Sequence, residues 1–129
     1  MSTLKVNTIQ DASGSNGSTP AQIANGRIKS WVSYNQATDT VNDSYNVSSV
    51  TDNATGKFTV NFTTSFVNAN YGFAGSCNRA GTTAEAVGMT MANSPDTYAT
   101  GNCKVMTGWP DNDQLYDCEV NNVVFFGDQ

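Results

Sequence analysis

The sequence predicts an all-β protein, an antiparallel β-sandwich of jelly-roll-like form that carries an extended arm at its N-terminus. Three observations predict this fold. Only 13% of the 129 residues are charged, against about 25% in ordinary soluble domains, and Asn, Thr, Ser and Gly take their place. Apolar and polar residues alternate along several short runs, which is the pattern of half-buried strands. Gly, Asn, Asp and Pro separate these runs and supply turns.

Residues 1–27 are expected to form an arm for attachment or oligomerisation, distinct from a β-sandwich domain over residues 28–129. A short extended apolar pattern opens the arm, and a polar loop over residues 11–18 follows it. The arm holds too few apolar residues to build a core, so we expect it to become ordered against a partner. The apolar residues predicted to act in assembly are Leu4, Val6, Ile9 and Ile23.

A short helix is predicted between this loop and the β domain. Thr19 is a suitable N-cap, Pro20 occupies the favoured first position of a helix, and Gln22 can complete a capping box. Gly26 is placed to end the helix. A helix of one or two turns is marginal alone because its nucleation is costly, which again indicates a partner.

Strands are predicted along the remainder of the chain. The clearest is KFTVNFTT (residues 57–64), in which apolar and polar side chains alternate. The preceding DNATG supplies turn residues, with Gly56 suited to a positive φ angle. We therefore expect a hairpin that joins residues 44–51 to residues 57–64. The other predicted strands are residues 28–35, 41–51, 70–77, 86–92, 103–109 and 116–127.

The last of these strands is apolar on both faces. Val123 and Phe125 point to one side, whereas Val124 and Phe126 point to the other. A strand of this kind is expected at the centre of a sheet or beneath a neighbouring subunit.

The residue types argue against an enzyme. The chain has no histidine, which removes the usual general base, the Ser-His-Asp triad and most zinc sites. The three cysteines form no Cys-x-x-Cys pair and are expected to be small buried hydrophobes, although one pair could bridge in an oxidising environment. No phosphate-binding glycine motif occurs. We therefore expect no catalytic residue and no cofactor.

The charge distribution argues against nucleic acid and membrane partners. The net charge is −5 and the six basic residues are scattered singly, whereas nucleic-acid binding relies on clustered Lys and Arg. No apolar run approaches the ~20 residues that span a bilayer. The N-terminus also lacks the apolar region of a signal peptide, so we expect synthesis in a cytoplasm and no membrane insertion.

Two groups of residues are candidates for ligand contact. Asp111 and Asp113 could bind calcium, but the spacing of an EF-hand is absent, so a solvated turn is the simpler interpretation and no metal site is predicted. Trp109, Tyr98 and Tyr116 could stack on a glycan or anchor an interface. Core aromatics with a polar edge are the simpler interpretation of each.

The opening TLKVNTIQDASGSNGSTP resembles the N-terminal segments of tail-fibre-like and other virion surface proteins of marine and cyanobacterial tailed bacteriophages. The runs GRIKSWVSYNQ and DSYNVSSVTDNATGKFTVNFTTSFVNANYGFAGS also look like a module of these proteins. The likeness covers about residues 3–77, and a weaker match occurs at the VNNVVFFG ending. Its most specific part, YNVSSVTDNATGKFTVNFTT, coincides with the predicted hairpin. Residues 78–115 carry no such resemblance.

The resemblance implies a non-enzymatic, homotrimeric virion protein, a fibre or appendage of the tail or particle surface. Its partners would be copies of itself, capsid or tail proteins, and a glycan or protein of the host surface. In a fibre, loops near residues 80–83, 93–102 and 110–114 would face the host or the medium. The alternative is a capsid decoration (cement) protein whose arm lies along the shell. A carbohydrate-binding module and, last, a small hydrolase are further hypotheses.

Overall fold

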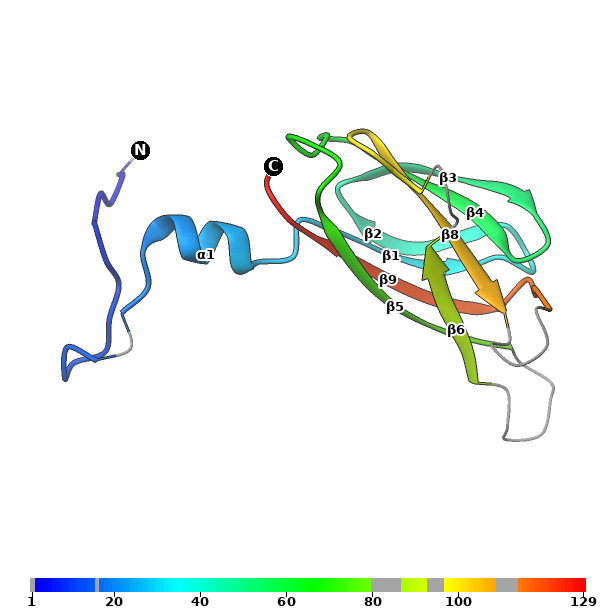
Figure 1. The fold of residues 1–129 in the computed structure, drawn as a ribbon, viewed down its shortest axis with the longest axis horizontal. Coiled ribbons are helices and arrows are strands. Elements are labelled where there is room, and N and C mark those ends of the chain that lie inside the picture. The colour runs from blue at the N-terminus through cyan, green and yellow to red at the C-terminus, as the bar shows by residue number, and fades with distance from the viewer. Residues whose placement is uncertain (1, 16, 80–86, 93–96, 109–113) are drawn as a thin grey trace.

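The structure is a computed structural model that describes residues 2–15, 17–79, 87–92, 97–108 and 114–129. In this part of the chain one short helix precedes nine strands, which form two antiparallel sheets packed face to face (Figure 1). The all-β sandwich predicted from the sequence is thereby confirmed. The jelly-roll-like form, the attachment arm and the trimer stay predictions.

The first sheet has the strand order β2–β1–β9–β5. Strand β9 lies between β1 and β5, which agrees with the central position expected for a strand that is apolar on both faces. Its Val123 and Phe125 are buried against the second sheet, whereas Phe126 faces outward. The bounds are β1 (Ser30–Asn35), β2 (Thr40–Tyr45), β5 (Gly72–Asn78) and β9 (Val120–Phe126).

The second sheet contains β8, β4 and β3, with the short β7 also paired to β8. Strand β6 connects the two sheets, because its first residues pair with β5 and its later residues pair with β8. One edge of the sandwich is closed in this way. The bounds are β3 (Val47–Ala54), β4 (Lys57–Phe62), β6 (Val87–Ala92), β7 (Tyr98–Ala99) and β8 (Asn102–Gly108).

The predicted hairpin is present as β3 and β4, with Gly56 in the turn at a φ angle of 62°. The prediction of one strand over residues 41–51 is wrong. This segment contributes to two strands, β2 and β3, which belong to different sheets. They separate at Asn46, whose φ of 56° lies in the left-handed region that Asn tolerates. The Asn46 amide accepts a hydrogen bond from the Thr64 N–H at 2.7 Å and donates to the Lys29 carbonyl at 3.2 Å. These bonds stabilise the change of direction between β2 and β3.

The last strand also differs from its predicted bounds, since it begins at Val120 and not at residue 116. The carbonyl oxygen of Cys118 accepts hydrogen bonds from the Gln36 N–H at 3.0 Å and from the Asn121 side chain at 2.8 Å. These bonds engage the Cys118 carbonyl outside the β9 ladder, and residues 116–119 are not part of the strand. The two-residue strand β7 had no signal in the sequence pattern.

Helix α1 (Pro20–Gly26) confirms the predicted helix and its cap. The Gln22 N–H donates to the Thr19 hydroxyl at 3.2 Å, and the Thr19 N–H donates to the Gln22 side chain at 2.8 Å. None of the helix residues is buried. In Figure 1 the helix and the chain before it lie to one side of the β domain.

The core lies between the two sheets and is largely aromatic. Phe62 of β4 packs edge-to-face on Phe125 of β9, with 5.0 Å between ring centroids, so this pair spans the space between the sheets. Phe66 packs on the same Phe62, and it stacks on Tyr71 at 4.2 Å. The other members of the core are Val32, Tyr34, Phe58, Val60, Cys103, Val105 and Val123.

A buried amide joins the two sheets at the hairpin turn. Gln36, at the end of β1, donates through Nε2 to the Asp52 carboxylate at 3.0 Å and to the Ala54 carbonyl at 3.2 Å. Within the first sheet, the Tyr34 hydroxyl donates to the Asp39 carboxylate of the β1–β2 connection at 2.7 Å. Burial, with this hydrogen bond, raises the pKa of Tyr34 above its ordinary value. Both sheets are thus held in a fixed relation at this end.

Gly56→Ala is expected to lower the free energy of unfolding by at least about 2 kcal/mol. An added Cβ would lie 2.5 Å from the Thr107 carbonyl oxygen, and φ at this position is positive. Urea unfolding measures the change. Gly26→Ala is the matched control, since a Cβ there meets no atom within 4 Å and should shift stability by less than about 1 kcal/mol. Equal losses in the two variants would contradict this account of the turn.

Candidate interaction surfaces

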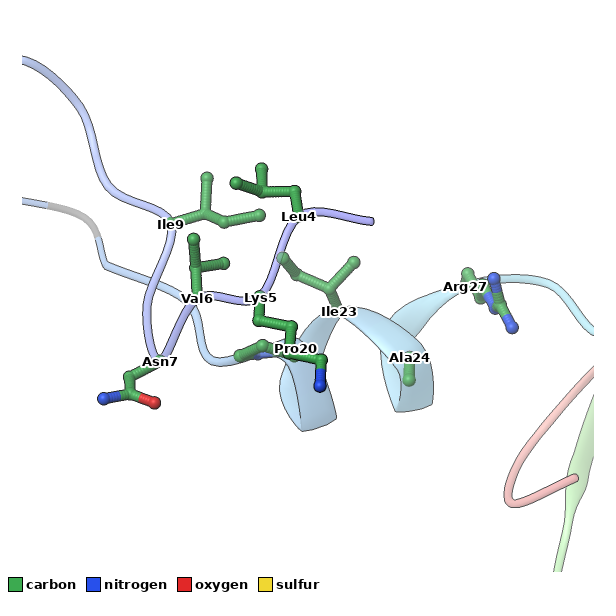
Figure 2. A pocket seen from close by; sticks show the side chains of 9 residues that line it. All are labelled: Leu4, Lys5, Val6, Asn7, Ile9, Pro20, Ile23, Ala24 and Arg27. Carbon is green, nitrogen blue, oxygen red and sulfur yellow. The ribbon is translucent and has the colours of Figure 1, made fainter. Parts of the chain in front are cut away.

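The four apolar residues predicted to act in assembly lie together in the structure. The Ile9 N–H donates to the Ser18 carbonyl at 2.9 Å and the Ser18 N–H donates back to Ile9 at 2.7 Å, which places the extended segment beside α1. Leu4, Val6 and Ile9 then face Ile23 around an open hollow of about 570 Å³ (Figure 2). The name N-terminal hollow is used below for this site. Its remaining lining residues are Lys5, Asn7, Pro20, Ala24 and Arg27.

The apolar side chains of the N-terminal hollow remain exposed although they lie close together. Leu4 is 82% exposed and Ile9 is 53% exposed. No described residue before Lys29 is buried. Full burial of an aliphatic side chain is worth about 1.5–3 kcal/mol. The hollow therefore offers apolar area that a partner can cover with a substantial gain in free energy.

The hollow also differs in charge from the domain that follows it. Lys5, Arg27 and Asp11 are the charged side chains of residues 1–27, which gives this segment a net charge of +1. Since the whole chain carries −5, residues 28–129 carry −6. Opposite charges of this kind favour contact between the segment of one chain and an acidic surface of another.

A second exposed surface is the outer face of the first sheet. The strand register aligns Tyr45, Trp31, Val124 and Ala74 in one row across β2, β1, β9 and β5. Tyr45 is 59% exposed. Beside this row the half-exposed ring of Phe126 lies over Gly72, where an added Cβ would come within 2.5 Å of the ring. We call the four aligned residues, one from each strand, the outer row. Apolar surface of this type is typical of protein contacts.

The structure places two of the three predicted aromatic contact residues, Tyr98 and Tyr116, apart from each other. Tyr98 is half-exposed and packs edge-to-face on Tyr71, with centroids 5.2 Å apart. Tyr116 lies under the guanidinium of Arg79, which is 4.6 Å from its ring centroid. The two tyrosines are associated with opposite ends of β8. Trp109 lies outside the described residues, so a shared stacking platform stays untested.

The predicted calcium candidates, Asp111 and Asp113, also lie outside the described residues. Among the residues that the structure does describe, no group of three or more His, Cys, Asp or Glu side chains could hold a metal ion. In the same part of the chain, no helix has the length and apolar character needed to cross a bilayer.

Comparison with known proteins adds no relative. No family model, curated protein or solved structure matches this chain. The two surfaces are therefore interpreted from their own chemistry. An open apolar hollow and an exposed apolar sheet face both indicate contacts between macromolecules.

The sequence singles out the four apolar residues as an assembly set, but it reveals neither the hollow that they line nor the outer row. Leu4 and Val6 are two residues apart and therefore share one face of an extended segment, whereas Ile9 is three residues beyond Val6 and is out of step with them. The outer row takes one residue from each of four strands, and its register depends on pairings between distant segments. The one signal in the sequence is the apolar character of both faces of β9, which predicts a central strand or a neighbouring subunit.

Proposed function

We propose that this chain is a non-enzymatic structural component of a tailed-bacteriophage virion, a fibre or appendage protein that functions in assembly and host contact. The observation that carries the proposal is the N-terminal hollow. Four exposed apolar side chains gather there, and none of the surrounding segment contributes to the core. The resemblance of residues 3–77 to virion surface proteins supports the same conclusion.

In this proposal the N-terminal segment is an assembly arm. Because the β domain completes its core without the arm, the domain can fold first and leave the arm available for a later contact. Helix α1 has only seven residues and is marginal alone, so docking and ordering of the arm would occur together. The β domain would then project from the attachment point.

The proposal includes a homotrimer in which the arms meet and the outer row adds a second contact. Light scattering after size-exclusion chromatography is expected to give three times the chain mass. Leu4→Asp combined with Ile23→Asp should give a folded monomer, because burial of two unpaired carboxylates in the hollow costs more free energy than the contact supplies. Val67→Asp is the matched control, since Val67 is 66% exposed and belongs to neither surface. A wild-type chain that stays monomeric at high concentration would count against the trimer.

The copy number of this chain in purified particles tests the virion role itself and distinguishes a fibre or appendage protein from a capsid decoration protein. Quantitative mass spectrometry should compare this chain with the major capsid protein. A few to a few dozen copies per particle are expected for a fibre or appendage. One copy for every several capsid subunits would instead identify a decoration protein, with the arm as its capsid-binding element. Absence from every particle would overturn the proposal.

A further inference from the structure

Two of the three cysteines meet at one end of the sandwich. Cys77 of β5 is paired in register with Asn121 of β9. The Asn121 side chain donates to the Cys118 carbonyl at 2.8 Å, which holds Cys118 beside this strand pair. The two thiols are close enough for a side-chain hydrogen bond between them. Both are nearly covered, with Cys77 5% and Cys118 2% exposed.

The surroundings of the pair favour ionisation of one thiol. Hydrogen bonding from Cys77 is the largest influence and lowers the pKa of Cys118 below the usual range of a thiol. Thr107 and the positive charge of Arg79 act in the same direction, while burial and Asp117 oppose them. Since the thiolate is the nucleophile in thiol chemistry, Cys118 is the member of the pair suited to react first.

Cys103 occupies a contrasting environment and supplies an internal control. It is fully buried in the aromatic core. Burial raises the pKa of its thiol to about 12, although a hydrogen bond with Tyr71 lowers it. A thiol that stays protonated in a closed core reacts slowly. Oxidation should therefore discriminate between Cys103 and the other two cysteines.

We propose that Cys77 and Cys118 form an intramolecular disulfide when the folded protein enters an oxidising environment. The bond would tie the end of β5 to the segment that leads into β9. The inference goes beyond the proposed function and does not rest on it, because it depends only on the position of the two thiols. The side-chain hydrogen bond between the two cysteines places their sulfur atoms beside each other, as a bond between them requires.

A peroxide is the class of oxidant that suits nearly covered thiols, because hydrogen peroxide is small. The Cys118 thiolate attacks one peroxide oxygen, which breaks the O–O bond and gives a sulfenic acid and hydroxide. The Cys77 thiolate then attacks the Cys118 sulfur, which forms the S–S bond and releases a second hydroxide. The two thiol protons convert both hydroxides to water. Two thiols are oxidised and one peroxide is reduced.

The disulfide would close a long loop that contains β6, β7 and β8. Cross-linking stabilises a folded chain chiefly by restricting the unfolded chain, and the effect grows with loop length. The protein could thus fold with free thiols in a reducing cytoplasm and become locked afterwards. A shell or fibre protein exposed outside the cell would benefit from such a lock.

Peptide mapping of the folded full chain tests the pairing directly. Trypsin cleaves after Lys57, Arg79 and Lys104, which places the three cysteines on separate peptides, 58–79, 80–104 and 105–129. After hydrogen peroxide, quenching, and alkylation under denaturing conditions, peptide 58–79 should be linked to 105–129. Cys103 should be alkylated. Alkylation of all three cysteines, a link to peptide 80–104, or over-oxidised Cys118 without a link would each overturn the proposal.

Thermal unfolding tests the consequence of the bond. Peroxide treatment should raise the Tm of the wild-type chain by on the order of 10 °C, and dithiothreitol should reverse the rise. Cys77→Ala should lose the rise, whereas Cys103→Ala, the matched control, should keep it. An unchanged Tm in the wild type, or the same rise in Cys77→Ala, would contradict stabilisation by a Cys77–Cys118 disulfide. The peptide map uses the wild-type chain and therefore decides the pairing even if a variant folds poorly.

Discussion

The edge-to-face contact between Phe62 and Phe125 is the interaction on which the rest of the structure depends. It is the aromatic contact that joins β4 of one sheet to β9 of the other, and Phe66 and Tyr71 pack around it. Tyr71 extends the same cluster to the β7–β8 turn, because its hydroxyl donates to the Ala99 carbonyl at 3.0 Å. Buried aromatic rings are stable when they are closely packed, and a buried hydroxyl such as that of Tyr71 also needs a hydrogen-bond partner. This cluster meets both conditions with side chains from both sheets. The two sheets therefore form one cooperative unit.

The completeness of this core determines what the N-terminal segment can do. The segment adds no side chain to the core, so its apolar residues remain on the surface. A chain that exposes such side chains in one place carries a risk of unspecific association unless a partner covers them. The exposed hollow and the self-contained domain are thus two aspects of one arrangement, which suits a protein that folds first and assembles afterwards.

The sequence predicted those features that depend on neighbouring residues. The helix cap of Thr19 and Gln22, the turn at Gly56 and the burial of the apolar side chains of β4 all follow from local rules, and the structure confirms them. The division of residues 41–51 was not predictable in this way. It depends on bonds from Asn46 to Lys29 and Thr64, which are remote in sequence.

Surfaces and clusters that depend on strand register could likewise not be predicted from the alternation of apolar and polar residues. The outer row becomes visible only when β2, β1, β9 and β5 are placed side by side. The meeting of Cys77 with Cys118 depends on the pairing of β5 with β9 and on the hydrogen bond from the Asn121 side chain to the Cys118 carbonyl. Alternation shows which face of a strand is apolar, but it does not show which strand lies beside it.

Amide hydrogen exchange, followed by mass spectrometry at low and at high chain concentration, tests the central claim most directly. The account predicts that the amides of β4, β8 and β9 are protected at both concentrations. Amides of residues 4–26 should exchange rapidly in dilute solution and become protected when the chains assemble. Protection of residues 4–26 in the isolated monomer, or rapid exchange in the assembled form, would contradict the claim that a partner orders this segment.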